Sequence, residues 1–66
     1  MKIVEVYRKY KNLSKQAEDL AFDTKSFIKK ESQNIDKEKM KMIKDCIDSI
    51  EFLARVFYAF GEDDYD

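Results

Sequence analysis

Two sets of carboxylates at helical spacing are the first residues that could do chemistry. Asp19 and Asp23 are four residues apart, and Asp45, Asp48 and Glu51 are three apart. On a helix each set would lie on one face, where paired carboxylates can bind a metal ion or exchange protons. Metal sites in helical bundles complete such carboxylates with histidine, and the chain contains none. Basic residues stand four positions from these carboxylates, so we interpret both sets as solvated faces and expect no metal, cofactor or small-molecule substrate.

Cys46 is the second candidate, as a nucleophile. A reactive thiol needs a neighbouring base, and no histidine exists to supply one. Its place in an apolar repeat predicts instead a small buried side chain. A lone cysteine is typical of a reducing cytoplasm, and the longest apolar run, residues 56–60, is too short to cross a membrane. With no nucleophile–base pair and no phosphate-binding loop, we expect a cytoplasmic protein that is not an enzyme.

A basic stripe on one face of the first predicted helix is the third candidate. One aromatic residue stands among its cations, and only Glu18 interrupts the row. Cations contact phosphates, and an exposed ring can stack on an unpaired base, so this stripe is a candidate RNA-binding surface. The formal net charge of −1 favours the alternative of an ordinary solvated face. The residues of the stripe are Arg8, Lys11, Lys15, Phe22, Lys25 and Lys29.

The elements that must hold these candidates are two helices. Apolar residues follow a heptad in which position a falls at Ile3 and position d at Val6, and the pattern restarts with a at Ile43 and d at Cys46. The neighbouring position e, as at Ala21 and Ile47, is also apolar and widens the stripe. The chain has no proline and one glycine, so neither segment is interrupted. A short connection makes the two helices antiparallel neighbours. The predicted elements of this all-α hairpin domain, residues 1–61, are a helix at 2–31, a turn at 32–36 and a helix at 37–60.

Four residues mark the predicted ends of the second helix. Asp36 can cap its first turn, and Ile35 and Met40 have the spacing of a hydrophobic staple around that cap. Gly61, the single glycine, is expected to stop the helix in a left-handed conformation. Residues 62–66 are then a short acidic tail.

The apolar residues exceed what two helices can hide from water. Residues 52–60 cover nearly every side of the second helix with apolar groups, and each large side chain left exposed forfeits about 1.5–3 kcal/mol. We therefore expect two copies of the hairpin to form a four-helix bundle; a higher oligomer, an obligate heteromer and a monomer are the alternatives. The primary function hypothesis is a small regulator or inhibitor that docks a helical face onto an unknown partner protein. The expected protein-interface residues are Tyr7, Phe22, Phe52, Val56, Phe57, Tyr58 and Phe60.

The end of the second predicted helix reads Ala-Phe-Gly-Glu-Asp-Asp at residues 59–64, which is similar to the ending of the Rop proteins. These plasmid copy-control proteins are helical hairpins that dimerise into four-helix bundles. The resemblance implies the same architecture and an alternative function, an RNA-binding dimer that uses the basic stripe. The RNA-contacting pattern of the first Rop helix does not align with this chain, so the resemblance assigns no site residue.

Overall fold

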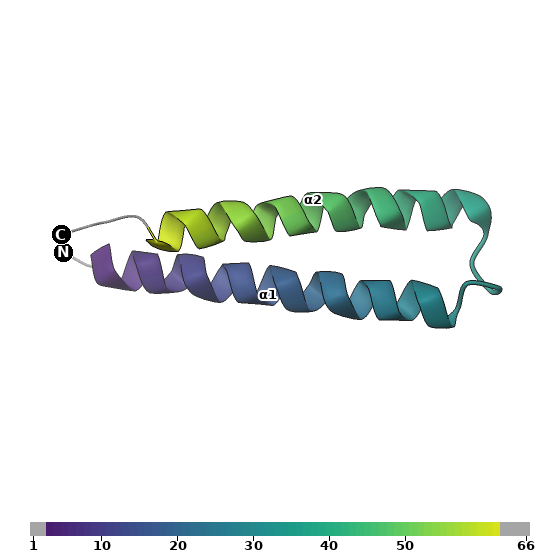
Figure 1. Ribbon diagram of the computed structural model, residues 1–66, viewed down its shortest axis with the longest axis horizontal. Helices are drawn as coiled ribbons and strands as arrows, with labels where there is room; N and C mark the ends of the chain where they lie inside the picture. The colour runs from purple at the N-terminus through teal and green to yellow at the C-terminus, as the bar shows by residue number, and fades with distance from the viewer. Residues whose placement is uncertain (1–2, 63–66) are drawn as a thin grey trace.

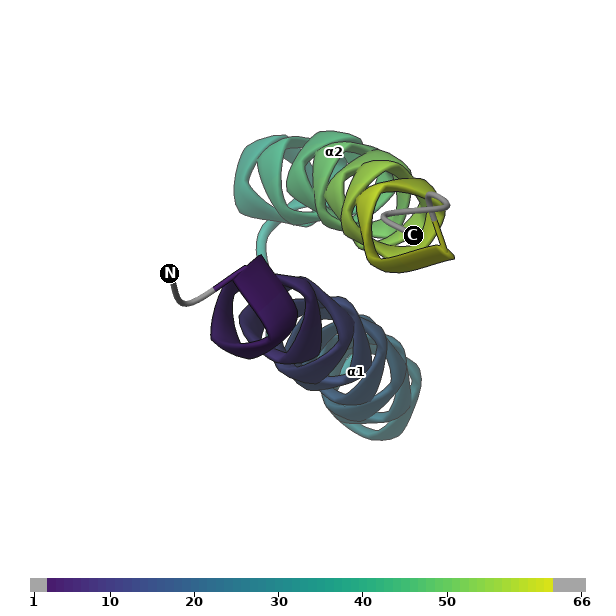
Figure 2. The same cartoon turned by 90° about the vertical axis from the view of Figure 1, so that its left-hand side faces the viewer.

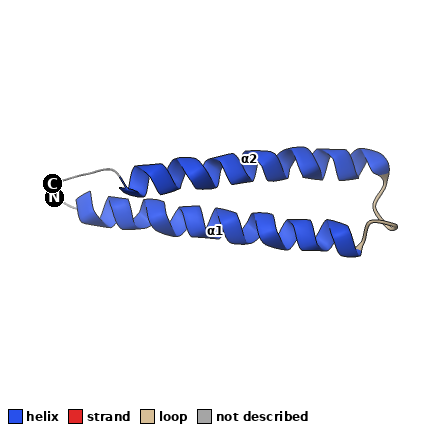
Figure 3. Ribbon diagram, viewed as in Figure 1, coloured by secondary structure: helices blue, strands red, loops and turns tan. Residues whose placement is uncertain are grey.

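The described part of the structure, residues 3–62 of a computed structural model, consists of two helices joined by one turn. Helix α1 spans Ile3–Lys30 and helix α2 spans Lys37–Glu62. Figures 1 and 3 show them antiparallel and side by side, with the start of α1 beside the end of α2. The predicted all-α hairpin is therefore confirmed for this part of the chain.

The turn and the start of α2 are held by local hydrogen bonds. The backbone N–H of Asn34 donates to the carbonyl of Glu31 at 2.8 Å. A carboxylate oxygen of Asp36 accepts the backbone N–H groups of Glu38 and Lys39 at 2.8 and 3.3 Å. These two bonds satisfy amides that have no partner within the helix, so the predicted cap is confirmed. Both staple residues, Ile35 and Met40, pack against the apolar cluster behind the turn.

Small side chains let the two helices approach closely. Ser14 and Ala54 are buried where the helices meet, and the Ser14 hydroxyl donates to the Ala54 carbonyl across the contact at 2.8 Å. Nearer the turn, Ile28 and Ile47 pack with Ala21. Three of the five buried hydrophobic residues in the described part are alanines, which bury little apolar area, so the core of a single hairpin is thin. These five residues are Ala17, Ala21, Ile28, Ile47 and Ala54.

Gly61 lies inside α2, and the predicted stop at this residue is wrong. The helix continues to Glu62, and no glycine has a positive φ. Gly61 is buried against α1, where an added Cβ would lie 2.6 Å from Cγ of Lys11. The residue therefore permits close contact between the helices. Residues 63–66, most of the predicted acidic tail, lie outside the described residues.

Aromatic rings surround Tyr10 at the open end of the hairpin. The ring of Tyr10 stacks on that of Phe57, with centroids 5.9 Å apart and an angle of 20° between the planes. The rings of Tyr7 and Phe60 meet Tyr10 edge-on, at 5.9 and 5.4 Å. This cluster fixes the axial register of α1 and α2 beside the close contact at Gly61.

The hairpin is a long single layer. Its principal extents are 50 × 15 × 14 Å, and its radius of gyration of 15.2 Å exceeds the value of about 11 Å typical of a compact chain of this length. Figure 2 looks along the pair from the open end and shows only the two helices. No further element among the described residues covers either side of the pair.

Candidate interaction surfaces

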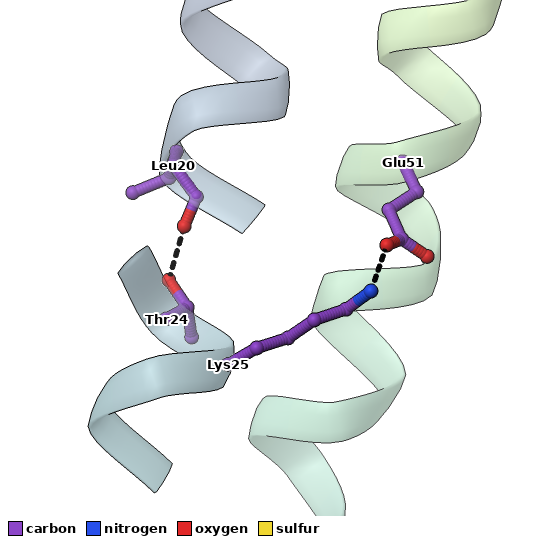
Figure 4. A network of polar contacts seen from close by, with 4 residues as sticks. All are labelled: Leu20, Thr24, Lys25 and Glu51. Carbon is purple, nitrogen blue, oxygen red and sulfur yellow. Dashed lines mark hydrogen bonds and ion pairs between the residues drawn. The ribbon is translucent and has the colours of Figure 1, made fainter. Parts of the chain in front are cut away.

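The helices meet along positions a and e of the heptad, so position b flanks the contact on one side and position d on the other. Lys25 and Glu51 both occupy position b, and they form an ion pair between the helices (Figure 4). The two b rows therefore share one side of the hairpin. Because equivalent positions of antiparallel helices flank their contact on the same side, the two d rows share the opposite side.

We call the side that carries the d rows the apolar side. Its large side chains are open to solvent: Leu20 is 54% exposed, Phe27 is 53% exposed and Leu53 is 46% exposed. Cys46 also lies on this side and is exposed, so its predicted burial is wrong for the single hairpin. The physical reason is that position d lies outside the a and e contact. The apolar side consists of Val6, Leu13, Leu20 and Phe27 from α1 and Cys46, Leu53 and Phe60 from α2. The remaining d position of α2 carries Lys39, at the end of the row nearest the turn.

We call the side that carries the b rows the charged side. In addition to the pair between Lys25 and Glu51, the ammonium of Lys11 lies 2.9 Å from the carboxylate of Glu62. Figure 4 shows how Lys25 crosses from α1 to α2, whereas the hydroxyl of Thr24 donates to the carbonyl of Leu20 within α1 at 2.7 Å. The b rows include Val4, Lys11, Glu18 and Lys25 from α1 and Lys44, Glu51 and Tyr58 from α2. Glu62 joins this side through its pair with Lys11.

A shallow groove of about 350 Å³ lies on the charged side between the helices. Its floor is formed by Ala21 and Ala54, which are both buried. Phe22 stands at its rim and is 70% exposed. The groove is open and has ion-paired walls, so it can accept the surface of another macromolecule but encloses no small molecule. Its lining residues are Glu18, Ala21, Phe22, Lys25, Glu51, Ala54 and Arg55.

The structure pairs three of the five cations of the basic stripe with carboxylates. Lys11 pairs with Glu62 and Lys25 with Glu51, across the helices. Lys15 lies 3.8 Å from the carboxylate of Asp19, one turn along the same helix, as its spacing indicates. These pairs lower the positive charge that the stripe presents to a polyanion. Arg8 and Lys29 complete the stripe, and both side chains are exposed.

The predicted protein-interface residues divide between three places. Tyr7 and Phe57 are half-buried in the aromatic cluster around Tyr10, and Val56 is also half-buried. Phe60 lies on the apolar side. The remaining three are exposed and lie outside the apolar side; they are Phe22, Phe52 and Tyr58.

The predicted interface residues do not include Leu20, Phe27 and Leu53. In the heptad pattern these side chains belong to the apolar stripe of the hairpin, in which position d is not distinguished from position e. Side-chain size is the sequence signal that distinguishes the contact positions a and e from position d. Positions a and e carry Ala17 and Ala21, and only small residues permit the closest approach of two helices.

Within residues 3–62 no group of three or more cysteine, aspartate or glutamate side chains is placed to hold a metal ion. Neither α1 nor α2 contains a stretch that is both long and apolar enough to cross a membrane.

No protein-family model, no curated protein and no solved structure matches the chain. The likeness to the Rop proteins therefore stays a resemblance of residues 59–64 and of predicted architecture.

Proposed function

We propose that the protein is a non-enzymatic protein–protein interaction module that works as a homodimer. Its apolar side packs on the apolar side of a second copy, which gives a four-helix bundle. The charged side of each hairpin then faces outward and docks onto a partner protein, whose activity the dimer regulates or inhibits.

The observation that carries the proposal is the shared position of the two exposed d rows. Leu20 and Leu53 come from different helices, yet both are on one side of the hairpin and about half exposed. Burying such a side chain contributes about 1.5–3 kcal/mol, which is large compared with what a thin core of alanines supplies. A second copy offers an identical apolar side, and a twofold axis covers both at once.

The exposed area supports a contact of this size. The accessible surface of the chain is 5613 Å², whereas a compact monomer of 7.9 kDa exposes about 4,400 Å². The excess is larger than the share of about 800 Å² that each partner buries in a standard protein interface. One bundle contact of two hairpins can therefore remove this excess.

Leu20→Glu, compared with Phe22→Glu, tests the dimer. Both residues lie on α1 and are exposed in the hairpin, so a single hairpin tolerates a charge at either position. Sedimentation velocity should give the chain mass for Leu20→Glu, and twice that mass for the wild type and for Phe22→Glu. Equal effects of the two substitutions would show that the apolar side is not the contact.

The partner protein is expected to contact the exposed aromatics outside the apolar side, because aromatic residues are typical interface anchors. Capture from a cell extract, with and without nuclease, tests this part. A protein that the wild type retains after nuclease treatment and that Phe22→Ala loses would support it. A protein retained only through RNA would instead favour the alternative function.

The alternative is an RNA-binding dimer that uses the basic stripe. The observation in its favour is the ring of Phe22, which is 70% exposed beside Lys25 and Lys29 and can stack on a base. A structured RNA should then shift at low salt, and Lys15→Glu or Phe22→Ala should weaken the shift. Absence of any shift at low salt would exclude this alternative.

A further inference from the structure

We infer that the second copy lies antiparallel on the first, so that the two turns are at opposite ends of the bundle. Helix α1 then faces α1 of the second copy, and α2 faces its α2. This inference rests on the proposed dimer and specifies how the two copies align.

The axial register of the hairpin sets the order of the d-row side chains. Two contacts between the helices, of Ser14 with Ala54 and of Tyr10 with Phe57, define which residues lie at the same height along the hairpin. The numbers of an α1 residue and of the α2 residue level with it add up to about 68. The d rows of α1 and α2 therefore alternate along the apolar side. Among the seven apolar residues of these rows Leu53 falls at the middle, with three toward the open end and three toward the turn. Lys39, the d position closest to the turn, lies beyond Phe27 at the edge of the apolar series.

The sizes of these side chains are matched about Leu53. A twofold axis that passes through Leu53 at right angles to the helices sets Leu13 against Leu20 of the second copy. The same axis sets Val6 against Phe27 and Cys46 against Phe60, so each end contact joins one small and one large side chain. Every layer of the bundle then has a similar volume, which favours dense packing without cavities.

The other twofold arrangement, with both turns at one end, gives an uneven core. It places each d-row residue at the same height as its own equivalent. Two Phe27 rings then share one layer near the turn, and two Cys46 side chains share the next layer. Cores with such alternating excess and deficit of volume lose stability through strain and cavities.

Charges that border the apolar side favour the same arrangement. Lys9, Gln16 and Asp23 occupy position g next to the d row of α1, and all three are exposed. In the antiparallel alignment Lys9 of each copy faces Asp23 of the other, which gives two opposite-charge pairs per dimer. The neutral Gln16 faces Gln16 of the second copy at the twofold axis. With both turns at one end, Lys30 would instead approach Lys39 of the second copy.

Cross-linking of Phe60→Cys, which keeps the native Cys46, tests the alignment. On one helix these positions are about 21 Å apart at 1.5 Å per residue, too far for a link within a chain. Oxidation or a short bis-maleimide should join position 60 of one copy to Cys46 of the other, and peptide mass mapping identifies the link. Cys46→Ser in the same chain is the control and should abolish this mixed link.

The possible outcomes separate the alignment from the dimer. Links of Cys46 to Cys46 and of position 60 to position 60 would overturn the alignment and leave the dimer standing. No link at all, together with the chain mass in sedimentation, would overturn both.

A charge exchange provides a second readout that keeps the Phe60 ring. Lys9→Glu or Asp23→Lys alone should raise the dimer dissociation constant about three- to tenfold, because two surface pairs turn repulsive. The double variant should return the constant to the wild-type value. Additive losses in the double variant would contradict the alignment.

Discussion

The two sides of the hairpin carry different side chains: ion pairs link the helices on the charged side, whereas large apolar groups are exposed on the apolar side. On the charged side, Lys25 and Lys11 of α1 reach carboxylates of α2 and span a shallow groove. On the apolar side, large side chains such as Phe27 and Leu53 stand half-exposed in two parallel rows. The charged side can therefore remain in water, whereas the apolar side gains free energy from any chain that covers it.

This difference follows from where the small residues lie. Ser14, Ala17 and Ala21 fall at positions a and e, so the closest contact of the helices forms there. The larger d-row residues are displaced to one flank of that contact. A helix pair built on a and d would have buried Leu20 within the hairpin. The choice of contact thus moves much of the apolar surface outward.

The largest expected difference is between two single charge substitutions at adjacent residues of α2, one on the apolar side and one outside it. Leu53→Glu puts two carboxylates into the proposed dimer contact and should cost about 3 kcal/mol or more per dimer. Phe52→Glu, at the adjacent residue, is 62% exposed in the wild type and should have little effect. Thermal unfolding at two protein concentrations checks this: Tm should depend on concentration for the wild type and Phe52→Glu only. A concentration-dependent Tm for Leu53→Glu would contradict the comparison.

An intermediate effect is expected from Gly61→Ala, in the helix contact beside Lys11 of the charged side. The new methyl group forces the stem of Lys11 aside and should lower the free energy of unfolding by about 1 kcal/mol. In a chain that already carries Lys11→Ala, the same substitution should stabilise, because alanine is the better helix former. Chemical denaturation of the four chains of this cycle measures both signs. The same sign in both backgrounds would refute the role of Gly61 in close contact.

The smallest effect is expected from the ion pair between Lys25 and Glu51. Both side chains are partly exposed, so the coupling free energy should be about 0.2–1 kcal/mol. A double-mutant cycle with alanine at each position, repeated at high salt, measures it. The coupling should fall with salt. A coupling free energy of several kcal/mol that does not change with salt would mean that the ion pair is shielded from solvent, which would contradict the description of the charged side.

The helical hairpin could be predicted from the sequence, but the division of its surface into an apolar and a charged side could not. The heptad and the Asp36 cap predict the hairpin and the start of α2, because both depend on residues near one another in the chain. The burial predicted for Cys46 was wrong for the single hairpin, because an apolar stripe of positions a, d and e does not state which two positions form the contact. Gly61 was misread because a helix stop and a close helix contact favour the same residue.

Sedimentation equilibrium of the wild-type chain across the micromolar range tests the central claim most directly. If the apolar side is covered by a second copy, the fitted mass should be twice the chain mass of 7.9 kDa and should fall toward that mass on dilution. A mass of 7.9 kDa at every concentration would contradict the account.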